Sequence, residues 1–167
     1  LAKAAITELL GQFPKMGVAV MGQDGDLRVT HMSRQLRVWL RQQGTGYYLE
    51  QLEDVRGALQ KAVFCGEPSR VDFLEQYAKE RNLGDGLRCL RIDHSVLSLQ
   101  PAAATRGTAL LELARLCGVA PSDCVYIGGC GEAQEAMCLA GHTAAVKGAP
   151  PRVLLAADAV TTISASE

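Results

Sequence analysis

The strongest constraint on the fold is the order of helix and strand patterns between Thr105 and Val146. Thr105 is a suitable helix cap, and the apolar pattern that follows it ends at Gly118. An unbroken apolar strand at 124–127 comes next, then the glycine-rich stretch 128–131, a second helix and a second strand. A further helix and a last strand complete the chain. This alternation predicts a parallel sheet with right-handed crossovers, in which the 124–127 strand is covered on both faces.

The preceding residues predict a second layer of mixed structure. Asp24 and Gly25, between two β-like runs, indicate a hairpin, and Ser33 is a plausible helix cap. The predicted elements are helices at 2–13, 34–44 and 68–81, strands at 18–21, 27–31, 87–92 and 95–99, and a short buried strand in KAVFCGE. We expect a mixed sheet of about four strands with two or three helices on one face, an α+β arrangement. The chain is therefore expected to divide into domains 1–99 and 100–167.

Composition excludes several classes of function. The 167 residues are 48% apolar and 21% charged, with a net charge of −1. This gives no electrostatic basis for binding nucleic acid or an anionic membrane, and no apolar run reaches the roughly 18 residues of a membrane span. None of the six cysteines forms a C-x-x-C pair, so we expect free thiols in a cytoplasmic protein, with Cys117, Cys124 and Cys138 buried.

A ligand site is expected where the predicted parallel strands end. Ligands of such sheets bind at the carboxyl edge, and a loop that opens a helix offers N–H groups to an anion. These rules select the phosphate-binding candidates Gly128, Gly129, Cys130, Gly131 and Lys147. Cys130 has a second interpretation as a nucleophile with His142 as its base. A dinucleotide site is a further alternative, although GGCGEAQ does not complete the G-x-G-x-x-G pattern.

The stretches RGTALLELARLCGV and DCVYIGGCGEAQEAMCLAGHTAAVKGAPPRVLLAADAVT resemble the C-terminal segment of the Cof-type branch of the haloacid dehalogenase (HAD) superfamily. The family pattern is Lys-Gly-x-Ala-Leu, an apolar strand, Gly-Asp-x-x-Asn-Asp, Met-Leu, Ala-Gly and Ala-Asp-x-Val-Thr. FPKMGVAV and LQKAVFCGEPSRVDFLEQ are similar to the family's cap. The resemblance implies an α/β fold, with a HAD-like Rossmannoid parallel sheet in the C-terminal half and an α+β cap domain. It also implies magnesium-dependent hydrolysis of sugar phosphates or other small phosphomonoesters.

Carried over to this chain, the family's catalytic positions are only partly filled. The family Lys, which neutralises charge, corresponds to Arg106, and the metal-binding Asp corresponds to Gly129. The Asn-Asp pair falls on Glu132 and Ala133, which leaves Glu132 as the candidate ligand of Mg²⁺ and Glu135 as an alternative. The nucleophile motif Asp-x-Asp-Gly-Thr is absent, because the similar string GQDGDL is better explained as a hairpin turn.

Three functions are compatible with these departures. The resemblance favours a HAD phosphatase that is inactive or incomplete as this chain, which would comprise the cap and the C-terminal half of the core. The second is a working phosphatase of which this chain is a fragment, as a first residue other than Met suggests. The third is a non-catalytic regulatory or interaction module that binds a small phosphorylated molecule. Without the family's central strand, the 124–127 strand has an open edge. We expect that edge to recruit the missing N-terminal core half, a second copy in a homo-oligomer, or another protein.

Overall fold

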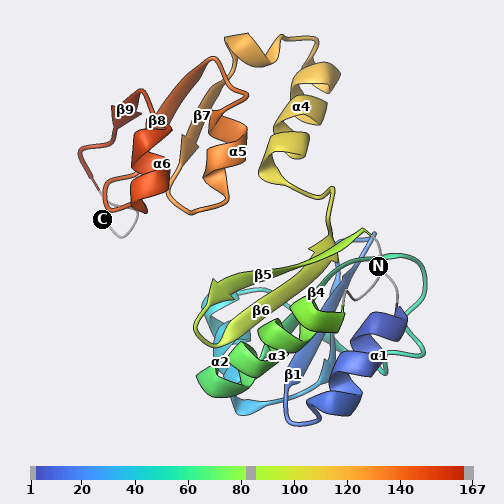
Figure 1. Cartoon of the computed structure of the whole chain (residues 1–167). Coiled ribbons are helices and arrows are strands. Elements are labelled where there is room, and N and C mark those ends of the chain that lie inside the picture. The colour runs from blue at the N-terminus through green and yellow to red at the C-terminus, as the bar shows by residue number, and fades with distance from the viewer. Residues whose placement is uncertain (1–2, 82–85, 164–167) are drawn as a thin grey trace. The chain divides into compact units, whose positions relative to one another are not determined.

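The computed structural model describes residues 3–81 and 86–163. The chain divides into two compact units, unit 1 (Leu1–Ala102) and unit 2 (Ala103–Glu167), each with its own sheet (Figure 1). The expected boundary after residue 99 would cut the last strand of unit 1, which continues to Pro101.

In the described part of unit 1, six strands form one sheet in the order β3-β2-β1-β4-β6-β5. Their bounds are Gly17–Gly22 (β1), Leu27–His31 (β2), Tyr48–Leu49 (β3), Leu59–Cys65 (β4), Leu87–Asp93 (β5) and Val96–Pro101 (β6). Adjacent strands are antiparallel except β2 and β3, which are parallel. The predicted hairpin joins β1 to β2, and Gly25 in its turn has a φ of 80°, which favours glycine. The sheet is larger than the expected four strands, in part because Tyr48 and Leu49 add a short edge strand.

Helices cover both faces of this sheet (Figure 1). The helices of unit 1 are α1 (Lys3–Gln12), α2 (Arg34–Gln43) and α3 (Pro68–Arg81). α1 and α3 pack on the face that bears Val18 and Val20, whereas α2 packs on the face that bears Ala19. The prediction of helices on one face only is therefore wrong. Consecutive residues of β1 point to opposite faces and are all apolar, so both faces need cover.

The predicted caps of α2 are present. The Ser33 hydroxyl accepts a hydrogen bond from the N–H of Leu36 at 3.1 Å, and Gly44 ends the helix in the left-handed region with a φ of 63°. Gly17 on β1 allows this helix start to approach the sheet, because a Cβ at Gly17 would lie 2.6 Å from the Cβ of Leu36.

In the described residues of unit 2, three strands lie in the order β7-β8-β9, and they are parallel, as predicted. The elements are α4 (Arg106–Cys117), the short 3₁₀ helix η1 (Pro121–Asp123), β7 (Val125–Gly128), α5 (Ala133–Met137), β8 (His142–Ala145), α6 (Pro151–Leu155) and β9 (Ala159–Val160). Thr105 caps α4 in a reciprocal capping box with Thr108, and Gly118 ends the helix with a φ of 69°.

The helices α5 and α6 cover one face of this sheet only. Met137 of α5 and Val153 of α6 pack with Ala145 of β8 in one buried cluster. On the opposite face, Val125 and Ile127 of β7 are 66% and 63% exposed. The prediction that this strand is covered on both faces is therefore wrong. β7 is also an edge strand, since β8 is its only neighbour within the described residues.

The burial of the cysteines differs between the two units. All six lie in the described residues and are free thiols. Cys65, at the end of β4, is buried, and this burial raises the pKa of its thiol to about 12. Cys117 and Cys138 are exposed and Cys124 is half-buried, so the prediction that these three are buried is wrong. They lie in unit 2, where only part of the apolar surface is covered.

Candidate functional site

Two loops meet at the carboxyl edge of the unit 2 sheet. Gly128 is the last residue of β7 and pairs with Ala145, the last residue of β8. The N–H of Val146 donates a hydrogen bond to the carbonyl of Gly128 at 3.0 Å. The glycine-rich loop that follows β7 and the segment containing Lys147 that follows β8 therefore begin side by side, which is where the strand order predicted a ligand site.

The glycines of this loop lie close to neighbouring side chains. A Cβ on Gly128 would lie 2.5 Å from the Cβ of Ala133, and a Cβ on Gly129 would lie 3.1 Å from the Cβ of Val146. A Cβ on Gly131 would overlap the guanidinium of Arg152. The loop is thus tightly enclosed by the start of α5, the end of β8 and the start of α6. The helix that follows the loop, α5, has only 5 residues, so the free N–H groups at its start attract an anion less strongly than the sequence suggested.

Arg106 stands beside this loop. It is the first residue of α4, and its Nε lies 3.6 Å from Oε2 of Glu132 in an ion pair. A hydrogen bond with the Tyr126 side chain is the main cause that raises the pKa of Arg106, with smaller contributions from Cys130 and Glu132. Arg106 is therefore cationic at any working pH, and its side chain remains 51% exposed and accessible to a ligand.

Glu135 fixes the start of α4 against α5. The Thr105 hydroxyl donates a hydrogen bond to Oε1 of Glu135 at 2.8 Å. Gly107 allows this approach, because a Cβ there would lie 2.7 Å from both Cγ and Cδ of Glu135. The carboxylate of Glu135 thus holds the helix that carries Arg106 and is directed toward Thr105 rather than toward the glycine-rich loop.

Arg152 is a candidate that the sequence reasoning missed. It is the second residue of α6, which starts just after the carboxyl edge of β8. Its guanidinium lies over Gly131, where a Cβ would be 2.8 Å from Cζ and 2.9 Å from Nε. The sequence position of Arg152 could have suggested it. The helix that follows a strand of a parallel sheet starts near the carboxyl edge of that strand, so an arginine at its start lies near the loop that follows the neighbouring strand.

The residues of this site do not fit Mg²⁺. Gly129 and Ala133 offer no side-chain oxygen, and the carboxylate of Glu132 is paired with Arg106. Across the described ranges 3–81 and 86–163, no group of three or more His, Cys, Asp or Glu residues could hold a metal ion. Mg²⁺ is coordinated by about six oxygen ligands, and a single carboxylate that is already paired with an arginine is not a sufficient ligand set.

The pairing of Cys130 with His142 is not formed. Cys130 follows the carboxyl end of β7, whereas His142 is the first residue of β8 and pairs with Val125 at the opposite end of β7. A histidine at the far end of the strand cannot act as the base for that thiol. Cys130 is exposed in the loop, as expected.

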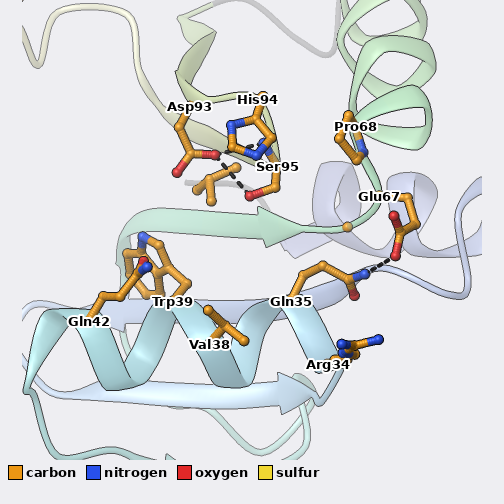
Figure 2. A pocket seen from close by; sticks show the side chains of 12 residues that line it. Arg34, Gln35, Val38, Trp39, Gln42, Glu67, Pro68, Asp93, His94 and Ser95 are labelled. Carbon is orange, nitrogen blue, oxygen red and sulfur yellow. Dashed lines mark hydrogen bonds between the residues drawn. The ribbon is translucent and has the colours of Figure 1, made fainter.

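Unit 1 contains a separate cavity of about 410 Å³ (Figure 2). Trp39 and Gln35 of α2 form one wall, and Asp93, His94 and Ser95, at the turn between β5 and β6, lie across from them. Oδ1 of Asp93 accepts hydrogen bonds from the N–H and the hydroxyl of Ser95 at 2.6 and 2.9 Å, so this carboxylate braces the turn. His94 lies in this turn, as predicted, and is exposed.

Comparisons with known proteins agree on one family. A family model described as haloacid dehalogenase-like hydrolase matches residues 33–167. A phosphoglycolate phosphatase of Methanoculleus marisnigri is 42% identical over 91 residues, which are 54% of this chain and 38% of that protein.

Solved structures share the fold. A haloacid dehalogenase-like hydrolase from Bacteroides thetaiotaomicron superposes with a TM-score of 0.83 at 16% identity, covering 96% of this chain and 62% of that chain. A sugar phosphatase of HAD subclass IIB superposes with a TM-score of 0.73 at 12% identity, covering 95% of this chain and 59% of that chain. The chain thus spans less than two thirds of each of these relatives. In the part of the chain that the structure describes, no helix is long and apolar enough to cross a membrane.

Proposed function

The chain belongs to the family of haloacid dehalogenase-like hydrolases, and from this premise we propose that it is part of a phosphatase of the Cof-type branch that acts on small phosphomonoesters. In this proposal, the chain supplies the loop and the cation that receive the phosphoryl group and does not hydrolyse the ester unaided. The relatives named as a phosphoglycolate phosphatase and a sugar phosphatase support the substrate class.

One observation carries the proposal: the guanidinium of Arg106 stands beside the glycine-rich loop at the carboxyl edge of two parallel strands. Phosphoryl transfer depends mainly on positioning and on neutralising the charge of the transferred group. A permanent cation on a capped helix, held by the contact of Thr105 with Glu135, meets the second requirement. Arginine also suits the planar, forked geometry of phosphate oxygens.

Among the residues that the structure describes, none is placed as a nucleophile at the loop. Asp24, in the string GQDGDL, lies in the turn between β1 and β2 of unit 1. Its Oδ1 accepts a hydrogen bond from Arg28 at 3.0 Å, and Arg28 lowers the pKa of Asp24 to about 2. This carboxylate therefore fixes the hairpin through an ion pair. Catalysis in the proposed phosphatase requires an aspartate from outside these residues.

We assign the open edge of β7 to that missing part. The exposed side chains of Val125 and Ile127 and the unpaired edge of the strand invite an added parallel strand together with a helix that covers the bare face. Because the chain spans 62% or less of the compared relatives, the proposed occupant is the remaining half of the family's core sheet.

A second function has its own support. The replacement of metal-binding side chains by Gly129 and Ala133, together with the pairing of Glu132 with Arg106, favours a module that binds a phosphorylated ligand without hydrolysing it. In that case the chain would be regulatory, and the open sheet edge would serve an interaction.

The test is hydrolysis of an aryl phosphate by the purified chain with and without Mg²⁺, together with binding of inorganic phosphate followed by NMR shifts of the loop amides. We expect binding without turnover. Magnesium-dependent turnover that Arg106→Ala abolishes would show that a nucleophile within the chain has been misplaced. No shift of any loop amide with phosphate would refute the proposed site.

A further inference from the structure

We infer that the glycine-rich loop is a metal-independent receptor for a phosphate monoester dianion, in which the guanidinium groups of Arg106 and Arg152 take the place of the divalent cation. The inference rests on the proposed function, because it assumes that the loop receives a phosphoryl group. It adds Arg152 to the site and removes the dependence on Mg²⁺.

The charges around the loop support this substitution. Within the described residues of unit 2, the side chains of Arg106 and Arg152 border the loop, while Glu132 and Glu135 are the neighbouring carboxylates. Glu132 is ion-paired with one of these cations, and Glu135 is bonded to Thr105. Both carboxylates therefore already have partners, and residues 128–131 add no further carboxylate for a divalent cation.

Arg152 lies against the loop at Gly131. Its guanidinium fills the space that the side chain of any other residue at 131 would occupy, so the glycine brings the cation into contact with the loop backbone. Arg106 meets the next residue, Glu132, from α4. The two guanidinium groups thus approach adjacent loop residues from two helices, α4 and α6. Each arginine offers a fork of N–H donors to phosphate oxygens, whereas Mg²⁺ binding would need carboxylates that the loop lacks.

The experiment titrates the full chain with inorganic phosphate by calorimetry, in EDTA and in millimolar Mg²⁺. The variants are Arg106→Gln and Arg152→Gln. The matched control is Arg115→Gln, an arginine of α4 that is paired with Glu112 at 2.7 Å. We expect each of the two site variants to weaken binding about three- to tenfold, as suits exposed charge-assisted contacts, and the control to leave it unchanged. Mg²⁺ should not strengthen binding by the parent chain.

A second variant tests Arg152 through its contact. Gly131→Ala retains the arginine but displaces its guanidinium from the loop, so it should weaken phosphate binding to a similar degree. A thermal melt of each variant establishes that it is folded.

The outcomes separate the two proposals. Loss of binding in Arg106→Gln with no change in Arg152→Gln and Gly131→Ala would overturn the inference and leave the proposed function standing. Tighter binding with Mg²⁺ would overturn the metal independence. Absence of phosphate binding by the parent chain would overturn both.

Discussion

In the proposed correspondence with the family, Gly129 takes the place of the metal-binding carboxylate, and its replacement tests what the loop now contacts. A Cβ at this position would lie 3.1 Å from Cβ and 3.4 Å from Cγ2 of Val146, slightly closer than ordinary packing. Val146 is half-buried and must move by a few tenths of an ångström. Gly129 does not have a positive φ, so its backbone accepts any residue.

These contacts determine how much a substitution at Gly129 should lower the unfolding free energy. Mild overpacking of this kind lies at the low end of its usual range, about 1 kcal/mol of unfolding free energy, which corresponds to a loss of roughly 4–8 °C in Tm for a unit of this size. Gly129→Ala, Gly129→Asn and Gly129→Asp should all show this loss in a thermal melt followed by circular dichroism. Only the last adds a negative charge.

The charge should separate the aspartate variant in a phosphate titration. A carboxylate about 6 Å from a phosphate dianion costs about 1 kcal/mol in a water-like medium, so Gly129→Asp should bind phosphate roughly fivefold more weakly than Gly129→Asn at low salt. Equal affinity of the two variants would show that the anion does not sit at this loop. Unfolding of Gly129→Ala would show that the loop geometry has been misjudged.

Three further predictions follow from other contacts. Gly107→Ala should lower the unfolding free energy in a urea titration by about 1 kcal/mol, because the added Cβ displaces Glu135 and breaks its hydrogen bond to Thr105, the cap of α4. Alanine by itself favours a helix, so a more stable variant would contradict this prediction. Ile127→Lys should leave the melting temperature nearly unchanged but weaken self-association about 5- to 30-fold in sedimentation experiments. The Ile127 side chain is 63% exposed, so its burial in an interface would contribute about 1–2 kcal/mol to association. Equal self-association of the variant and the parent chain would exclude β7 from the contact. Cys65, with a pKa of about 12, should resist iodoacetamide at pH 8 until the chain unfolds, whereas Cys130 should react in the native state, as peptide mass spectrometry can check; rapid native labelling of Cys65 would refute its burial.

Local signals predicted the parts of the fold that local chemistry decides. Ser33 and Thr105 cap the two helices that the sequence assigned to them, and Gly44 and Gly118 end those helices in the left-handed region. Such features depend on one or two neighbouring residues, so a single sequence is sufficient to find them. The parallel arrangement of β7, β8 and β9 followed from the alternation of helices and strands.

The features that the sequence did not predict depend on what lies across the fold. An apolar run such as VYI looks the same whether its chain supplies cover for both faces or for one, so the pattern alone did not predict the exposure of Val125 and Ile127. Only the missing central strand of the family indicated an open edge there. The contact of Arg152 with Gly131 joins residues from different loops, and no local pattern marks it. The position of α2 on the second face of the unit 1 sheet depends on the long-range pairing of β1 with β4.

The open edge of β7 also affects how readily the protein aggregates in the cell. The residues 124–128, CVYIG, are uncharged, contain no proline and have strong β propensity, and they lie on an edge strand with an apolar face exposed. Segments of this kind template the stacking of identical chains into aggregates. We expect a copy whose β7 edge stays uncovered to be a substrate for chaperones and proteases, which would lower its steady-state abundance.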